Sequence, residues 1–219
     1  MPVPTKLMMA TSGFVPLVTY TAKVTPGAMF SWGACSAGQL GTNTASSGVD
    51  MSSPVQIGSL TTWKHGAGGS FTFHVIKSDG TLWAWGQNNA PSWAMLGDST
   101  AIDRSSPVQI GSLTNWSKIQ AGGTIAAAIK TDGTLWCWGR ATGAGGGGVG
   151  DGENISRSSP VQIGSSTDWT SIGCAEYTTA GIRDGGKLFT WGSDYFGQLG
   201  RGTNNVPISS PIQVGSLTT

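Results

Sequence analysis

Short apolar runs that alternate with a period of two recur along the chain. In Leu82-Trp83-Ala84-Trp85 the two tryptophans fall on one face of an extended strand, while the leucine and a small residue fall on the other. Turn residues such as Asp132-Gly133 separate these runs, because Asp-Gly tolerates the positive φ values of a tight hairpin. No segment sustains a 3.6-residue apolar period. The pattern therefore predicts an all-β fold.

The pattern repeats every 53 residues. The dipeptide Trp-Gly marks each repeat and begins at Trp32, Trp85, Trp138 and Trp191. The segment Ser-Ser-Pro-Val-Gln-Ile-Gly at 52–58 keeps the same phase, and its last version, at 209–215, arrives two residues early. Each repeat contains four short candidate strands, for example 108–110, 116–120, 125–130 and 135–138. Repeats of about 40 to 55 residues with four strands each are typical of β-propeller blades.

We therefore expect one β-propeller domain over residues 1–219, built from four blades of about 53 residues. Its repeats fall at about 10–62, 63–115, 116–168 and 169–219. The N-terminal segment aligns with three strands of a blade, and the strand at 209–215 is left over. We expect that strand to complete the N-terminal blade and close the ring, which would protect the sheet edges. The alternative is a larger ring assembled from several chains.

The number and balance of charged residues exclude some classes of binding partner. Lys and Arg number 12 against 11 Asp and Glu, the formal net charge is +1, and only 11% of residues are charged. Nucleic-acid binding depends on clustered basic residues, so nucleic acid is excluded as an expected partner. No run of 18 apolar residues exists, which argues against membrane insertion. The three cysteines are an odd number without CxxC spacing, so they predict neither a disulfide framework nor a zinc site.

The sequence contains no constellation of polar residues that indicates an enzyme. An active site has to break the repeat, yet His65 and His74 align with unrelated residue types in the other repeats and have no partners for a triad. The glycine run at 143–148 lacks the following helix that a phosphate loop needs. Acidic loop residues do not reproduce a calcium-loop spacing; they are Asp98, Asp103, Asp151 and Glu153. We predict no catalytic residue, no cofactor and no metal site.

A few loop residues are candidates for contacts with a partner. They are Trp93, Arg104, Arg157, Tyr195 and Phe196. Trp93 is the tryptophan that departs from the repeat phase, whereas the in-phase tryptophans are expected in the core. Arg104 and Arg157 occupy equivalent positions, where they either anchor an acidic partner or pair with Asp103 or Glu153 nearby.

Two motifs carry a resemblance to a known family. Asp-Gly-x-Leu-Trp-x-Trp-Gly occurs at 79–86 and 132–139, and Gly-Gln-Leu-Gly occurs at 38–41 and 197–200. Over nearly its whole length the chain resembles the regulator of chromosome condensation (RCC1) repeat family of β-propellers, and in style it is similar to the phage and bacterial members. The His-Ser that the family often has after its Ala-Gly turn is missing here, with Thr72-Phe73 in one such place.

The resemblance and the lack of a chemical site together favour a non-enzymatic scaffold that mediates protein–protein contacts. The partner is then another protein or further copies of the chain. Similarity to phage members implies a virion or extracellular structural component, such as a capsid decoration or tail-associated protein. The family also implies an alternative, guanine-nucleotide exchange or chromatin adaptation. A further alternative is a glycan-binding module that uses Trp93, Tyr195 and Phe196.

Overall fold

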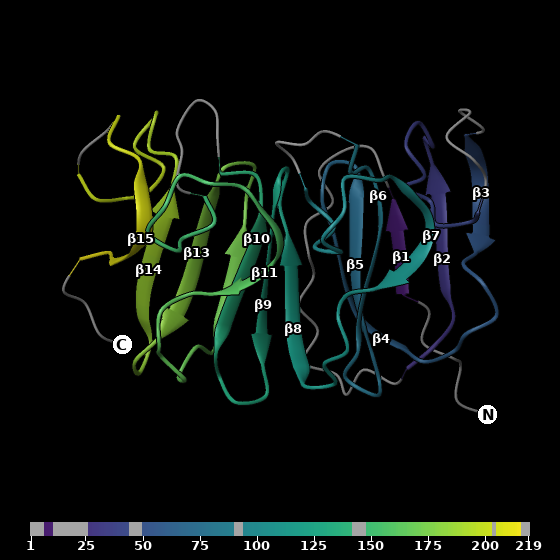
Figure 1. Ribbon diagram of the computed structural model, residues 1–219, viewed down its shortest axis with the longest axis horizontal. Coiled ribbons are helices and arrows are strands. Elements are labelled where there is room, and N and C mark those ends of the chain that lie inside the picture. Colours follow the sequence, from purple (N-terminus) through teal and green to yellow (C-terminus); the bar gives the residue numbers. More distant parts are fainter. Residues whose placement is uncertain are drawn as a thin grey trace.

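Four β-sheets stand side by side in chain order (Figure 1). The structure is a computed structural model that describes residues 7–10, 26–43, 50–89, 94–141, 148–202 and 205–215. All regular elements in these ranges are strands, which confirms the all-β prediction. Three sheets are four-stranded antiparallel meanders, and the sheet nearest the N-terminus has three strands. The first and fourth sheets lie at opposite ends of this row.

The strands follow one plan. The first sheet contains β1 (Leu7–Ala10), β2 (Met29–Gly33) and β3 (Met51–Gln56), with β1 parallel to β2. The second contains β4 (Trp63–Gly68), β5 (Thr72–Lys77), β6 (Leu82–Gly86) and β7 (Arg104–Gln109). The third contains β8 (Trp116–Ala121), β9 (Ile125–Lys130), β10 (Leu135–Gly139) and β11 (Arg157–Gln162). The fourth contains β12 (Ser171–Cys174), β13 (Thr178–Arg183), β14 (Lys187–Gly192) and β15 (Ile208–Gln213).

The predicted closure of the ring by the C-terminal strand is wrong. β15 pairs with β14, where Thr190 faces Ile212, instead of completing the N-terminal sheet. In every repeat the strand after Trp-Gly folds back onto the strand that carries the tryptophan, so β7 pairs with β6 and β11 with β10. The strand at 108–110 therefore ends the second sheet and does not begin the third. Consecutive strands usually pair within one sheet. With β15 in the fourth sheet, the row of sheets stays open.

The core lies between the sheets. Aliphatic residues of one sheet, such as Ile76 and Leu82, form a buried cluster with Trp116 and Trp138 of the next. The same plan joins the third and fourth sheets, where Trp169 and Trp191 complete the cluster. The in-phase tryptophans that the sequence assigned to the core are mostly buried there: Trp63, Trp85, Trp116, Trp138, Trp169 and Trp191 are at most 5% exposed. Stacking of sheets, rather than any single sheet, thus provides the hydrophobic burial.

Candidate functional site

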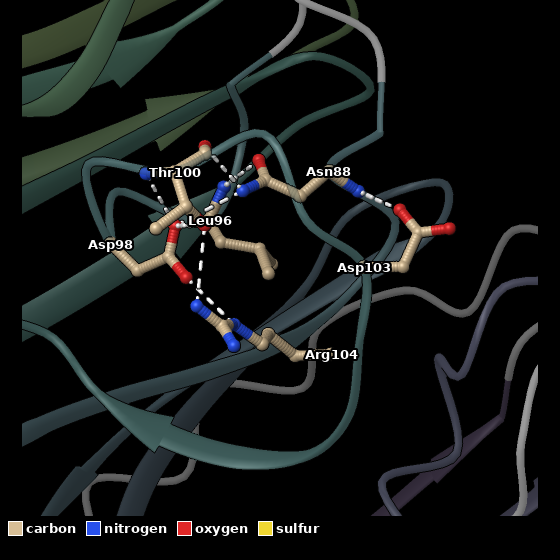
Figure 2. A network of polar contacts seen from close by, with 6 residues as sticks. All are labelled: Asn88, Leu96, Asp98, Thr100, Asp103 and Arg104. Atoms are coloured by element: carbon tan, nitrogen blue, oxygen red, sulfur yellow. Dashed lines mark hydrogen bonds and ion pairs between the residues drawn. The ribbon is translucent and has the colours of Figure 1, made fainter.

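The loop between β6 and β7 is held by a compact network of polar contacts (Figure 2). Arg104 Nε lies 2.8 Å from Asp98 Oδ2, and the Asp98 side chain is only 3% exposed. Asn88 Nδ2 donates to Asp98 Oδ1 at 3.0 Å and to the Thr100 carbonyl at 2.7 Å. The Asn88 backbone N–H donates to Asp103 Oδ1. Arg104 therefore pairs with Asp98, and Asp103, which the sequence offered as its partner, instead binds the backbone at the start of the loop.

Hydrogen bonds keep the buried side chain of Asp98 ionised. Burial raises the pKa of the Asp98 carboxyl, but hydrogen bonds from Thr100 and Arg104 outweigh burial and hold that pKa below its usual value. Thr100 donates to Asp98 Oδ1 from both its backbone N–H and its hydroxyl, at 3.0 and 2.7 Å. The ionised Asp98 thus holds its own loop in place, which is a structural role.

The third sheet repeats the arrangement. Arg157 Nη2 lies 2.5 Å from Asp151 Oδ2 and 3.0 Å from Glu153 Oε2. Asp98 and Asp151 each precede the paired arginine by six residues, and the two pairs are 53 residues apart. That spacing is the sequence signal that would have identified the partner of Arg104. Each guanidinium is about a third exposed, with side-chain exposures of 31% and 32%.

His74 is enclosed between the second and third sheets. Its Nε2 donates to the Met95 carbonyl at 3.1 Å, and its ring lies 5.5 Å from that of Trp138 between centroids. Burial lowers the pKa of His74 to about 4, although hydrogen bonding to the backbone of Met95 and Leu96 opposes the shift. The equivalent residues in the next two repeats are Ala127 and Ala180, so the histidine occupies a place that small residues fill elsewhere.

His74 should make the protein less stable in acid. In the unfolded chain its pKa returns to about 6.5, so protons favour the unfolded state between pH 6.5 and 4. We expect the free energy of unfolding to fall by about 3 kcal/mol from this residue as the pH drops from 7 to 4. Urea unfolding of the wild type and of His74→Ala at both values measures it. Equal pH dependence in the two proteins would contradict the assignment.

Cys137 is a buried small side chain, and Cys174 is partly buried. Burial raises the pKa of Cys174 to about 12, and burial likewise raises the pKa of Cys137 well above its usual value. Cys35 is buried as well.

Within the described ranges no group of three or more His, Cys, Asp or Glu side chains is arranged to hold a metal ion. No helix in the same ranges is long and apolar enough to cross a membrane.

Tyr195 and Phe196 form an exposed aromatic pair in the loop after β14. Their rings lie 5.7 Å apart, and the residues are 54% and 89% exposed. The loop is ordered by a 2.7 Å hydrogen bond from the Phe196 N–H to Gln198 Oε1, and by another of 3.0 Å from the Leu199 N–H to the buried Asp194. Exposed apolar side chains on an ordered loop are typical of contact sites.

The sequence-predicted contact residues do not gather at one place. Arg104 begins β7 and Arg157 begins β11, on successive sheets, while Tyr195 and Phe196 contact each other on the fourth. Trp93 lies outside the described residues. Of the predicted candidates, the Tyr195–Phe196 pair is therefore the one that the structure assembles as an apolar surface.

Comparisons with known proteins agree with the repeat. The family model described as "Regulator of chromosome condensation (RCC1) repeat" matches residues 185–219. The mitochondrial RCC1 domain-containing protein RUG3 of Arabidopsis thaliana is 29% identical over 220 residues, covering 95% of this chain and 47% of the relative. The ultraviolet-B receptor UVR8 of the same plant is 28% identical over 184 residues, covering 80% of this chain and 39% of the relative. The chain thus spans half the length of these relatives or less.

Solved structures share the fold. Human WBSCR16 superposes with a TM-score of 0.71 at 22% identity, over 87% of this chain and 49% of that protein. Prp20p of Saccharomyces cerevisiae gives a TM-score of 0.71 at 19% identity, over 85% of this chain and 46% of that protein. The 53-residue repeats and the row of stacked sheets are thus similar to those of RCC1-like repeat proteins.

Proposed function

We propose that the chain is a non-enzymatic scaffold whose RCC1-like blades bind another protein. The observation that carries this proposal is the exposed Tyr195–Phe196 pair, since Phe196 is 89% exposed on a loop that internal hydrogen bonds keep in shape. Preordered aromatic side chains are frequent anchors of protein interfaces, because they bury much apolar area at a small entropic cost. The partner is another protein or a further copy of the chain.

The polar side chains favour a binding role for the protein over a catalytic one. Asp98 and Arg104 satisfy each other inside their loop. His74 and Cys137 are buried and Cys174 is partly buried, and the pKa values of all three side chains keep them uncharged at neutral pH. A nucleophile or general base needs the opposite, an accessible group whose pKa is poised near the working pH. We therefore assign no catalytic step to these side chains.

A location in a virion, as a capsid decoration or tail-associated protein, belongs to the same proposal. Its support is the low content of charged residues, 11%, which suits surfaces in standing contact with other proteins. Detection of the chain in purified particles by mass spectrometry tests this location, and its absence from them would contradict it.

Nucleotide exchange or chromatin adaptation is a second candidate, favoured by one neighbour of the same fold. That neighbour, yeast Prp20p, binds Gsp1p and histones. Nucleotide release from a GTPase, measured with and without this chain, tests the exchange activity. An unchanged release rate would remove that activity from consideration.

Replacing Phe196 by Ser should weaken partner binding by about tenfold or more, as expected for truncation of an anchor residue. Immobilised chain exposed to an extract of the source cells, with quantification of captured proteins, measures the effect. Ile102→Ser is the control, because Ile102 is also exposed, at 57%, but lies in another loop. Equal capture by the two variants would contradict the role of Phe196. A glycan array probed with the same variants tests the carbohydrate alternative.

A further inference from the structure

The first strands of three successive sheets lie beside one another. β4, β8 and β12 are each an edge strand of their own sheet, and β8 contacts both β4 and β12 across the boundaries between sheets. An edge strand leaves one row of its backbone N–H and C=O groups without a partner in its own sheet. We call the surface shared by these three strands the first-strand surface. It offers backbone polar groups as well as side chains.

A β-bulge occurs at the same point of β4 and β8. The register with the neighbouring strand shifts between Trp63 and His65 in β4, and between Trp116 and Lys118 in β8. Such bulges bend a strand and redirect its side chains. His65 and Lys118 stand 53 residues apart, in the same phase of the repeat. Both bulges therefore place a basic side chain at the equivalent point of the first-strand surface.

Three basic side chains come together at these bulges. Lys64 and Lys118 are exposed, and His65 is half-buried. The His65 ring hydrogen-bonds to the backbone of Ser117, the neighbour of Lys118 on the next sheet, and Ile76 lies opposite His65 on β5. Burial lowers the pKa of His65, and the charges of Lys118 and Lys64 lower it further. Both ammonium groups thus act on one imidazole, and we call the three side chains the basic cluster.

No carboxylate side chain balances the basic cluster. All 11 Asp and Glu residues of the chain lie in the described ranges. The ion pairs that they form there use other cations, which are Arg104, Arg157, Arg183 and Lys187. Lys118 Nζ donates to the Thr170 carbonyl, which satisfies one hydrogen bond but leaves the charge of Lys118 uncompensated.

The other described lysines already have a partner for their charge. Lys77 Nζ lies 3.5 Å from the ring centroid of Trp83, and Lys130 Nζ lies 3.5 Å from that of Trp136. Such contacts attract a cation to the face of the ring. Lys187 pairs with Asp184. Among the described lysines, the two of the basic cluster are therefore the ones whose charge is available to a ligand.

The chemistry of the basic cluster favours carboxylates as ligands. Lysine presents a compact point charge on a flexible stem, whereas bidentate recognition of one phosphate group is the property of the arginine fork. One lysine on each of two adjacent strands suits separate carboxylates spaced along a chain. The unpaired edges of β4 and β8 also offer backbone partners to an extended segment. These features fit an acidic stretch of polypeptide.

We propose that the basic cluster of Lys64, His65 and Lys118 binds an acidic segment of a partner protein, with one carboxylate at each lysine. The inference rests on the proposed protein-binding function and names the chemistry of a second contact, apart from the loop of Tyr195 and Phe196. Because the lysines are exposed, salt should weaken the binding.

NMR of the imidazole groups tests the assignment, since the chain has two histidines and the His74→Ala variant identifies the signal of His65. A hexaglutamate peptide at low ionic strength should raise the pKa of His65 by about one pH unit, because nearby carboxylates favour the imidazolium. An unchanged pKa would overturn the inference. Inorganic phosphate is the second probe. A response to phosphate with none to the peptide would assign the cluster to small anions and overturn the peptide ligand.

Substitution of single lysines tests the affinity. Lys64→Gln and Lys118→Gln should each weaken hexaglutamate binding about threefold, as expected for the loss of one exposed ion pair. Lys187→Gln makes the same change of net charge on β14, where the lysine pairs with Asp184, and should leave the affinity unchanged. Circular dichroism confirms that each variant is folded. Equal weakening by all three substitutions would show a response to net charge alone and would overturn the inference.

The Phe196→Ser variant separates this contact from the proposed function. It keeps the basic cluster, so it should bind hexaglutamate as tightly as the wild type. Capture of a protein through Phe196 by a chain that does not bind the peptide would overturn the inference and leave the proposed function standing. Peptide binding that depends on Lys64 and Lys118 would support the inference even if Phe196 captures nothing.

Discussion

Replacing Trp138 by Ala should lower the free energy of unfolding by about 4 kcal/mol, the middle of the range for truncating a buried aromatic side chain. Trp138 is 0% exposed and belongs to the cluster between the second and third sheets. The substitution also removes the donor that binds the Met95 carbonyl at 3.1 Å and exposes His74 beside it. Urea unfolding followed by circular dichroism measures the loss.

Trp136 on the same strand is the matched control. Its ring packs against Trp116 at 6.1 Å and under Lys130 Nζ at 3.5 Å, but it remains partly exposed. Trp136→Ala should therefore cost less than half as much as Trp138→Ala, because less apolar area is lost from the interior. Equal losses of unfolding free energy in the two variants would show that Trp138 does not hold the second and third sheets together.

A methyl group on Gly133 should cost about as much, near 4 kcal/mol, through backbone collision and backbone strain. Gly133 has a φ of 78°, and a Cβ there would lie 1.9 Å from the Thr167 carbonyl oxygen. Its own carbonyl accepts the Trp169 N–H at 3.2 Å, so the turn of the third sheet touches the start of the fourth. Because the obstacle is backbone, relief requires movement of the whole turn.

Gly164→Ala separates the two causes. Gly164 has a φ of 61°, similar to that of Gly133, but a Cβ there would meet nothing within 4 Å. Only the strain of the left-handed backbone remains, so we expect a loss of about 1 kcal/mol. Chemical denaturation of Gly133→Ala and Gly164→Ala gives the comparison. A similar loss in both would mean that the collision at Gly133 is relaxed without cost.

Local sequence was sufficient to predict the central strands of each repeat. Alternation in runs such as 135–138 and the Asp132-Gly133 turn depend only on neighbouring residues, and the structure has β9, that turn and β10 at these places. Pairing of the last strand was not determined in this way. Its sequence suits either of two sheet edges, and the structure pairs it with the preceding strand, β14.

Details of the candidate site were harder to predict from the sequence. Arg104 has Asp98 and Asp103 within six residues, and the choice between them depends on how the loop turns back on Asn88. His74 gives no sign of its burial, because the equivalent positions hold small residues that impose no polar requirement.

The repetition of the contacts between sheets has a consequence for how such chains evolve. At three successive boundaries a glycine of one sheet (Gly41, Gly97 or Gly150) leaves room for the Trp-Gly tryptophan of the next sheet, and the second and third sheets place the same aliphatic positions against that tryptophan. A duplicated stretch of 53 residues would therefore enter the row with both of its faces already matched to its neighbours. Gene duplication can then lengthen or shorten the array by whole blades, without any new contact having to evolve first.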